Sequence, residues 1–577
     1  MHSFLPSLFI VVSGLARVRA APTATIPAGT VLGTTCTNGA SAFLSIPFAK
    51  SPIGDLRWTS PQAYNETFPA NGLNATTKGA ICIQFGGVEF TEQGFTEDEN
   101  CLFLDVWVPK NANSTSNLPV KVWIHGGGEQ GGGTQNPIFD GCNLAGHDTV
   151  VVSISYRLGP LGFLTLASAG ISGNFGIQDI LLGLEWVQSH IAAFGGNPNK
   201  IVLFGQSAGA LNTFIISTLP QATSLISAAI YESGYGPQIA TSNTVNTIGT
   251  TYAAKLNCST TDAACLRAVL TSDLKTAAPT APFAIIYSNL NPTSLGFQPH
   301  VDGVTIPAQP WSIGPKVPMI IGSNSLEGGV FTIGTYGADP SAANYSSFLA
   351  TNFGPAASTV AEQYPLTLPA FTSTGKPGFA AIATVMTEAM FYCPVYQALL
   401  KAESNNIPVF TYLNSHTPSC PAVPLPIPGA THSTEVPYVF GNDVNQQGVI
   451  CNFSAAENVI SEELIAAWSA MAATGNPSVQ GAWEWPQWDN STSKGVNIAN
   501  ATSIGVVDYS QCGFWDTIDN TYLNFTDSSA NASSTNTTSG TGSGTGSKTG
   551  NGAESRAVIG LWGLVIAVGV SVSILIG

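Results

Sequence analysis

A serine between two glycines is the strongest chemical signal in this sequence. The motif Gly-x-Ser-x-Gly spans residues 205–209 with Ser207 at its centre, and it directly follows the apolar run Ile201–Phe204. The next segment, Ala208–Ile216, suits a helix. A sharp strand-to-helix turn exposes the serine Oγ at a helix N-terminus, where backbone N–H groups stabilise negative charge. The motif therefore predicts that Ser207 is the nucleophile of a hydrolase.

A second glycine-rich segment points to the same chemistry. Residues 125–128 read His-Gly-Gly-Gly and follow the apolar run Val120–Ile124. Glycines at a strand end let free backbone N–H groups approach the oxygen that becomes negative during acyl transfer. An ordinary flexible turn is the alternative interpretation. The order of the two motifs along the chain favours an oxyanion-binding loop.

A serine hydroxyl needs a general base, and the base needs an acid that orients it. In the hydrolase order the acid and then the histidine follow the serine, and the histidines downstream of Ser207 are His300, His416 and His432. We favour His432, in a loop expected after a strand, although a lone loop histidine is commonly a surface residue. Glu327 follows an apolar run and fits the acid, but surface acids are common too. The residues alone therefore leave the base and the acid open.

Several strings in the sequence match one known family in order, over roughly residues 30 to 515. They include residues 45–49 (Ser-Ile-Pro-Phe-Ala), 99–104 (Glu-Asn-Cys-Leu-Phe-Leu), 156–163 (Tyr-Arg-Leu-Gly-Pro-Leu-Gly-Phe), 193–198 (Ala-Phe-Gly-Gly-Asn-Pro) and 429–432 (Gly-Ala-Thr-His). With these strings the chain resembles the type-B carboxylesterases, the group that contains cholinesterases and fungal lipases. The resemblance implies an α/β-hydrolase fold, a large mostly parallel sheet flanked by helices with helical cap insertions. It also implies hydrolysis of small-molecule carboxylic esters with no cofactor and no metal.

The resemblance also implies roles for particular residues. Ser207 would be the nucleophile, His432 the general base and Glu327 the acid of a catalytic triad. Backbone N–H groups would bind the oxyanion at Gly127, Gly128 and Ala208.

The ten cysteines favour disulfides over metal sites, because none of them forms a Cys-x-x-Cys pair. The resemblance implies the disulfides Cys82–Cys101 and Cys258–Cys265, and the buried ion pairs Arg57–Glu99 and Arg157–Asp179. For the other six cysteines we expect the pairs Cys36–Cys142, Cys393–Cys420 and Cys451–Cys512.

The sequence departs from the family pattern in three places. Gln206 stands where the family usually has glutamate, which removes a charge beside the nucleophile. Glu129 follows the glycines where an aromatic residue is common. The segment between Cys82 and Cys101 is short and contains no tryptophan, which argues against a cation–π site for choline esters. In the family's lipases a longer segment forms a lid, so the short one favours soluble esters.

The body of the chain alternates strand and helix patterns, which predicts a mostly parallel sheet covered on both faces. We expect residues 21–525 to form one catalytic domain, with a helical cap around residues 340–400. A helix is expected where Ile180, Leu184 and Val187 share one face. Six short β-branched runs predict strands: Val120–Ile124, Thr149–Ile154, Ile201–Phe204, Ala228–Tyr231, Met319–Ile321 and Val409–Leu413.

Both ends of the chain have the composition of targeting segments. Residues 1–20 indicate a signal peptide, with a buried first strand as the alternative. Residues 526–556 are rich in Ser, Thr and Gly and predict a linker stalk. Residues 557–577 are apolar and uncharged and indicate a GPI-attachment signal, with a plain tail anchor as the alternative. The protein is therefore expected in the secretory pathway, extracellular or at the cell surface, touching a membrane only through this C-terminal segment.

Composition excludes one class of partner. The chain has 34 acidic and 18 basic residues, a formal net charge of −16, whereas nucleic-acid binding needs a basic footprint. A serine esterase is the favoured function. A lipase of the same fold is the second hypothesis, and a non-catalytic surface binding or adhesion module is the third. The sequence leaves the oligomeric state open.

Overall fold

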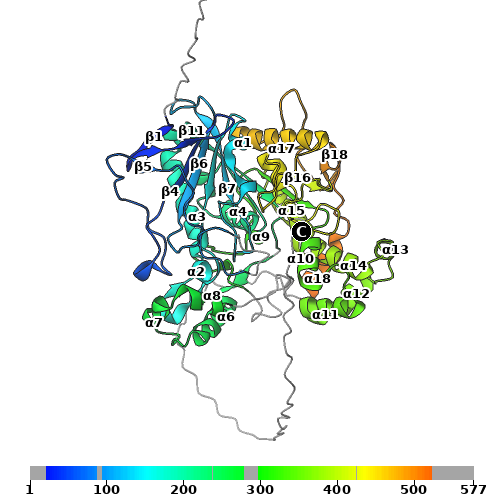
Figure 1. The fold of residues 1–577 in the computed structure, drawn as a ribbon. Coiled ribbons are helices and arrows are strands. Elements are labelled where there is room, and N and C mark those ends of the chain that lie inside the picture. Colours follow the sequence, from blue (N-terminus) through cyan, green and yellow to red (C-terminus); the bar gives the residue numbers. More distant parts are fainter. Residues whose placement is uncertain (1–20, 87–93, 237, 279–295, 424, 523–577) are drawn as a thin grey trace, which may run out of the picture. The chain divides into compact units, whose positions relative to one another are not determined.

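An eleven-stranded sheet runs through the protein in this computed structural model, which describes residues 21–86, 94–236, 238–278, 296–423 and 425–522 (Figure 1). Its order is β18-β17-β16-β15-β12-β11-β7-β8-β6-β4-β3. The neighbours from β8 across to β17 are parallel, and the pairs at the two edges are antiparallel. The parallel strands are β7 (Leu118–Ile124), β8 (Val150–Ile154), β11 (Gly196–Gln206), β12 (Ala228–Glu232), β15 (Met319–Asn324), β16 (Val409–Asn414) and β17 (Lys494–Ile498).

All six strands expected from β-branched runs are present in the parallel part of the sheet. The remaining strands of the sheet, apart from the parallel strand β17, form its antiparallel ends. These are β3 (Thr34–Thr35), β4 (Ser41–Pro47), β6 (Phe103–Val108) and β18 (Thr502–Val506). A separate small sheet is formed by β1 (Thr23–Ile26), β2 (Gly29–Leu32) and β5 (Leu73–Asn74).

Side chains alternate between two hydrophobic cores, one on each face of the sheet. On β7, Val122 and Ile124 belong to one core and Trp123 to the other. On β11, Leu203 and Phe204 divide in the same way, as the two-residue period of a strand requires. Apolar side chains are therefore needed at consecutive positions, which is why these strands read as continuous apolar runs.

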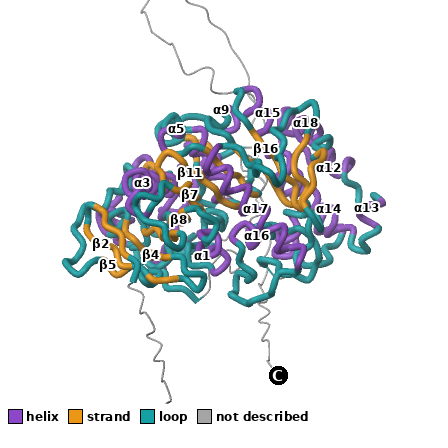
Figure 2. The backbone as a smooth tube through the Cα atoms, turned by 90° about the horizontal axis from the view of Figure 1, so that it is seen from above, coloured by secondary structure: helices purple, strands orange, loops and turns teal. Residues whose placement is uncertain are grey.

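Helices cover both faces of the sheet. The helices α3 (Phe175–His190) and α4 (Ala208–Thr218) pack in one core, and α16 (Val436–Phe440) and α17 (Ala455–Thr474) pack in the other. Figure 2 shows α3 and α17 on opposite sides of β7, β8 and β11. The expected helix through Ile180 and Leu184 is α3. This arrangement is the expected sheet between two helical layers.

The expected cap is a cluster of helices between β15 and β16, at the lower right of Figure 1. One helical run, Pro377–Ser404, is long and apolar enough to cross a bilayer, but most of it is buried inside the fold, as in a core helix. The cap helices are α10 (Gly328–Tyr336), α11 (Ala342–Phe353), α12 (Ala357–Gln363), α13 (Pro369–Thr372), α14 (Pro377–Met386) and α15 (Cys393–Ser404), with the π-helical segment Thr387–Tyr392 between the last two.

A second group of helices lies between β12 and β15, at the lower left of Figure 1. It consists of α6 (Ser242–Lys255), α7 (Ala263–Ala268) and α8 (Thr271–Ala277). The expected signal peptide (1–20), stalk (526–556) and C-terminal tail (557–577) lie outside the described residues, as does the end of the expected catalytic domain.

The structure pairs all ten cysteines, and two of the expected pairs are wrong. Cys393 is bonded to Cys512 and Cys420 to Cys451, not Cys393 to Cys420 and Cys451 to Cys512. The first pair joins α15 to α18 (Cys512–Tyr522), two helices that pack together. The second joins two loops that are already hydrogen-bonded from Gln446 N to Ala422 O, at 3.1 Å. The other disulfides are Cys36–Cys142, Cys82–Cys101 and Cys258–Cys265.

The length of chain that each disulfide closes predicts its contribution to stability. Cys393–Cys512 spans 119 residues and Cys258–Cys265 spans 7, so chain entropy assigns them about 5 and about 2 kcal/mol. We expect the double serine variant of the first pair to lose correspondingly more free energy of unfolding in denaturant titrations. Equal losses, or a non-reducing peptide map that joins Cys393 to Cys420, would contradict the pairing and its ranking.

Candidate active site

The predicted site residues come from the ends of four parallel strands, or from the loops that follow them, within the run β16-β15-β12-β11-β7 of the sheet. Ser207 follows β11, the glycine loop follows β7, Glu327 lies three residues after β15, and His432 lies in the segment between β16 and α16. Carboxyl ends of parallel strands share one edge of the sheet, where α/β proteins bind their ligands. The fold therefore gathers at one edge residues that are up to 305 positions apart.

The turn at Ser207 is strained and closely packed. Ser207 has φ 58° and ψ −123°, a region that non-glycine residues rarely adopt, and it directly precedes α4. A Cβ on Gly209 would lie 2.0 Å from Ile124 O, and one on Gly205 would lie 2.5 Å from Gly209 O. The two motif glycines are therefore required by the close approach of the turn to the end of β7.

The glycine loop packs directly against this turn. A Cβ on Gly126 would lie 2.9 Å from the Cβ of Ser207. Gly127 has φ +114° and Gly128 has φ +63°, a conformation that glycine adopts without steric cost. The loop thus brings the backbone of the predicted oxyanion-binding residues close to the predicted nucleophile.

His432 and Glu327 are in direct contact. His432 Nδ1 lies 2.6 Å from Glu327 Oε2, and the other carboxylate oxygen accepts a 2.6 Å hydrogen bond from Asn324 N. Both side chains are buried. Of the other two downstream histidines, His300 lies 3.4 Å from Thr165 Oγ1 and His416 lies 3.2 Å from Glu457 Oε1.

The second imidazole nitrogen of His432 contacts Gln206. Gln206 Nε2 lies 3.1 Å from His432 Nε2. If Glu327 accepts the Nδ1–H, the lone pair is on Nε2, and the amide N–H of Gln206 donates to it. A glutamate at this position could only accept, which would favour a protonated imidazole. Gln206 therefore contacts the imidazole nitrogen that does not face Glu327.

A further acid, which sequence reasoning missed, lies behind the His432–Glu327 pair. Glu435 accepts hydrogen bonds from Asn324 Nδ2 at 2.6 Å and from Ser233 Oγ at 3.2 Å. Burial, together with the nearby Glu327 carboxylate, raises the pKa of Glu435 to about 7. Its only sequence signal is its place three residues after His432, which does not distinguish it from other acids.

Aromatic side chains pack on the His432 ring. Phe331 of α10 and Phe391 of the π-helical segment have ring centroids 5.1 and 4.9 Å from the imidazole. Single π-helical turns inside longer helices are frequent at functional sites. Neither phenylalanine carried a signal in the sequence, because each lies within an apolar stretch.

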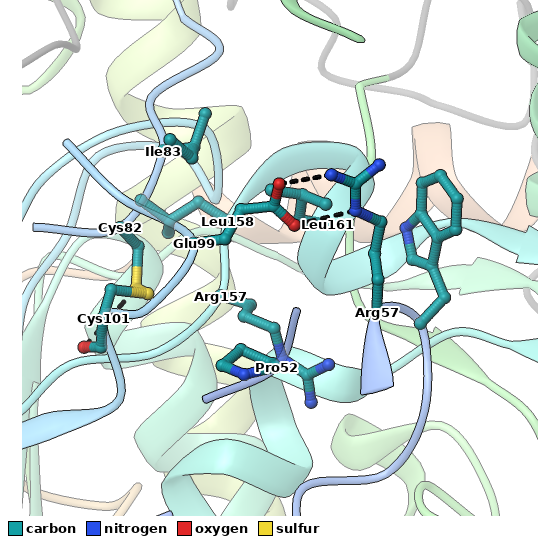
Figure 3. Close-up of a pocket in the computed structure, with 10 residues that line it drawn as sticks. Pro52, Arg57, Cys82, Ile83, Glu99, Cys101, Arg157, Leu158 and Leu161 are labelled. Carbon is teal, nitrogen blue, oxygen red and sulfur yellow. Dashed lines mark hydrogen bonds and ion pairs between the residues drawn. A yellow bond between two sulfur atoms is a disulfide. The ribbon is translucent and has the colours of Figure 1, made fainter. Parts of the chain in front are cut away.

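The pocket in Figure 3 is lined by none of the predicted site residues, and its polar side chains make structural contacts. The Arg57 guanidinium faces the Glu99 carboxylate across it, with Nε 2.8 Å from Oε2, and the Cys82–Cys101 disulfide forms another part of its wall. Arg157, which also lines it, makes a buried pair with Asp179 at 2.7 Å. Both expected ion pairs are thus present, and both join segments distant in sequence.

Within the ranges that the structure describes, no group of three or more His, Cys, Asp or Glu side chains could hold a metal ion. The polar groups at the strand ends are instead those of acid–base and nucleophilic chemistry.

Comparisons with known proteins agree with this arrangement. A solved structure described as a PNB esterase superposes with a TM-score of 0.71 at 30% identity, covering 85% of this chain and 99% of that one. With the strand-end site, this defines an α/β-hydrolase. The chain is 32% identical over 490 residues to para-nitrobenzyl esterase of Bacillus subtilis (strain 168), covering 82% of this chain and 94% of that protein. It is 29% identical over 532 residues to cholinesterase of Mus musculus, covering 84% and 83%.

The family follows from a further match. A model of the carboxylesterase family matches residues 20–515, so the chain belongs to the carboxylesterase family. The resemblance seen in the sequence and the α/β-hydrolase fold are therefore confirmed. The protein is a carboxylic ester hydrolase.

The contact between Gln206 and His432 predicts the pH dependence of hydrolysis. In Gln206→Glu, a carboxylate would stabilise the protonated imidazole, so we expect the acid limb of kcat/KM to move up by about one pH unit. Gln206→Met, which has similar size but no charge, serves as the matched control. Acid limbs that coincide in wild type and Gln206→Glu would contradict the assigned contact.

Proposed function

We propose that the protein hydrolyses small to medium carboxylic esters through an acyl-enzyme on Ser207, with His432 as general base and Glu327 as the acid that orients it. The observation that carries the proposal is the 2.6 Å contact of His432 with Glu327, at the sheet edge where the Ser207 turn also lies. A buried carboxylate that accepts Nδ1–H fixes the tautomer in which Nε2 takes a proton.

The proposed reaction begins when Ser207 Oγ attacks the ester carbonyl carbon and His432 Nε2 takes its proton. The carbonyl oxygen becomes negative and is bound by the N–H groups of Gly127, Gly128 and Ala208. The C–O bond to the alcohol then breaks, and the alcohol leaves with the proton from His432. Water, deprotonated by the same imidazole, hydrolyses the acyl-enzyme and regenerates the serine.

Gln206 has a defined part in this cycle. In the resting enzyme its amide N–H donates to the lone pair on Nε2 of His432. The same lone pair takes the serine proton in the proposed reaction. Gln206 must therefore release that lone pair when Ser207 transfers its proton. An amide, which donates through nitrogen and accepts through oxygen, can turn and accept from the imidazolium that results.

Removing the nucleophile tests the proposal. In Ser207→Ala we expect kcat for p-nitrophenyl acetate and butyrate to fall by about 10⁴-fold or more. Ser217→Ala, which removes another buried hydroxyl in the last turn of α4, should change kcat by no more than a few fold. Equal turnover by wild type and Ser207→Ala would overturn the proposal. The lipase alternative predicts instead that long-chain esters are preferred and that an oil interface activates the enzyme.

We also propose that the protein is exported and held at the cell surface by a GPI anchor. Five disulfides support an oxidising compartment, and residues 1–20 and 557–577 have the composition of a signal peptide and an attachment signal. On eukaryotic cells that express the full chain, a phosphatidylinositol-specific phospholipase should release the activity into the medium. Activity that stays with the membrane after this treatment would indicate a tail anchor.

A further inference from the structure

We propose that Gln84 is a positioning residue for oxyanion binding: its side-chain amide pairs with the backbone of Gly132 and thereby holds the glycine loop in place. The inference rests on the proposed function, because it concerns the loop to which oxyanion binding is assigned. It adds to that function a residue from outside the loop, in the segment between Cys82 and Cys101.

Residues 129–133, the return segment, fold back onto the glycine loop. Gly131 N donates a 3.0 Å hydrogen bond to the Gly127 carbonyl oxygen. A Cβ on Gly127 would lie 2.2 Å from Gly131 O. A Cβ on Gly132 would lie 2.3 Å from Gly126 O. The two segments are therefore in direct backbone contact, so the position of the return segment determines the position of the glycine loop.

Gln84 pairs with the return segment through two hydrogen bonds. Its Nε2 donates to Gly132 O at 2.9 Å, and its Oε1 accepts from Gly132 N at 2.8 Å. The Gln84 side chain is fully buried, and Gly132 is buried too. Two bonds to the same residue fix its orientation as well as its distance. An apolar side chain at position 84 would remove both partners from buried backbone groups, which is costly.

Gln84 is itself held by the segment that the Cys82–Cys101 disulfide closes (Figure 3). Its Nε2 also donates a 2.7 Å hydrogen bond to Cys82 O, and its backbone N donates a 2.9 Å hydrogen bond to Glu97 Oε2. The amide orientation follows from these partners, because Nε2 faces two carbonyl oxygens and Oε1 faces an N–H. Gln84 is therefore an anchor whose position is set outside the glycine loop.

The composition of the loop explains why it needs such an anchor. Residues 126–128 and 131–133 are all glycine, and glycine has access to many backbone conformations. Tyr156 holds the start of the loop, because its hydroxyl donates a 3.0 Å hydrogen bond to His125 O. Gln84 holds the other end. The predicted oxyanion-binding N–H groups lie between these two anchors, so their orientation depends on both.

Gln84→Met tests the inference, because methionine has a similar size but forms neither hydrogen bond to Gly132. A displacement of about 1 Å can cost an enzyme about 10²-fold in rate. We therefore expect kcat/KM for p-nitrophenyl butyrate to fall by about 10- to 100-fold. The rates are compared well below the unfolding temperature of each variant, measured by circular dichroism, so that unfolded protein does not contribute to the loss.

A trifluoromethyl ketone reports on oxyanion binding. Ser207 Oγ would add to the carbonyl carbon of 2,2,2-trifluoroacetophenone, the serine proton would pass to His432, and the carbonyl oxygen would become an alkoxide at the oxyanion site. Binding of such an adduct follows transition-state stabilisation. The inhibition constant in Gln84→Met should therefore rise by the same factor as kcat/KM falls. A fall in kcat/KM with an unchanged inhibition constant would overturn the inference.

The pH profile separates the loop from the triad. Gln84 has no part in the His432–Glu327 contact, so the acid limb of kcat/KM in Gln84→Met should stay where it is in wild type. A shifted acid limb would show that the substitution disturbs the base rather than the oxyanion site, and it would contradict the role assigned to Gln84.

Gln188→Met is the matched control. The Nε2 of Gln188 also donates to two backbone carbonyl oxygens, Pro198 O at 2.9 Å and Leu225 O at 2.8 Å. Gln188 lies on α3 and contacts the beginning of β11, whereas Ser207 follows the end of that strand. This variant should keep the wild-type kcat/KM and inhibition constant. Equal losses in Gln188→Met and Gln84→Met would count against a specific role for Gln84.

Two further variants separate the possible failures. If Gln84→Met does not fold, Gln84→Asn keeps an amide in the buried position but is one methylene too short to reach Gly132. It should show the same parallel losses, and wild-type values would overturn the inference. Full activity in Ser207→Ala would remove the proposed function itself. An inactive Ser207→Ala with unchanged kcat/KM in Gln84→Met would remove only the present inference.

Discussion

The close approach of two backbone segments governs the geometry of this protein. The turn after β11 passes so near the end of β7 that a Cβ on Gly209 would lie 2.0 Å from Ile124 O. This contact holds Ser207 in a strained conformation and sets the glycine loop against it. A strained backbone conformation persists only where the surrounding structure holds it in place. Here the strands on both sides of the turn are packed against a hydrophobic core on each face of the sheet.

Buried carboxyl groups around the strand ends are the second organising feature. Glu129, Glu232, Glu327 and Glu435 are all inaccessible to solvent or nearly so. Burial raises the pKa of Glu129, Glu232 and Glu435, which favours their neutral forms. Glu327 has an imidazole partner and a backbone N–H donor. The buried glutamates therefore differ in the partners that neighbouring elements bring to them.

The framework of this chain is that of its family. A model of the carboxylesterase family and a solved esterase structure both match most of the chain. The sequence resemblance leads us to expect a glutamate at position 206 and an aromatic residue at position 129, where this chain has Gln206 and Glu129. Gln206 precedes the predicted nucleophile, and Glu129 follows the glycine loop.

The sequence by itself determined six of the seven parallel strands, the cap, the family and the candidate residues Ser207, Glu327 and His432. Buried strands and glycine turns leave strong local patterns, because backbone sterics and burial act residue by residue. Only the tertiary structure decided the pairing of Cys393 with Cys512, the place of Glu435 behind Glu327, and the hydrogen bond from the Tyr156 hydroxyl to the His125 carbonyl oxygen. These depend on which segments, distant in sequence, pack together, and no local periodicity records that packing.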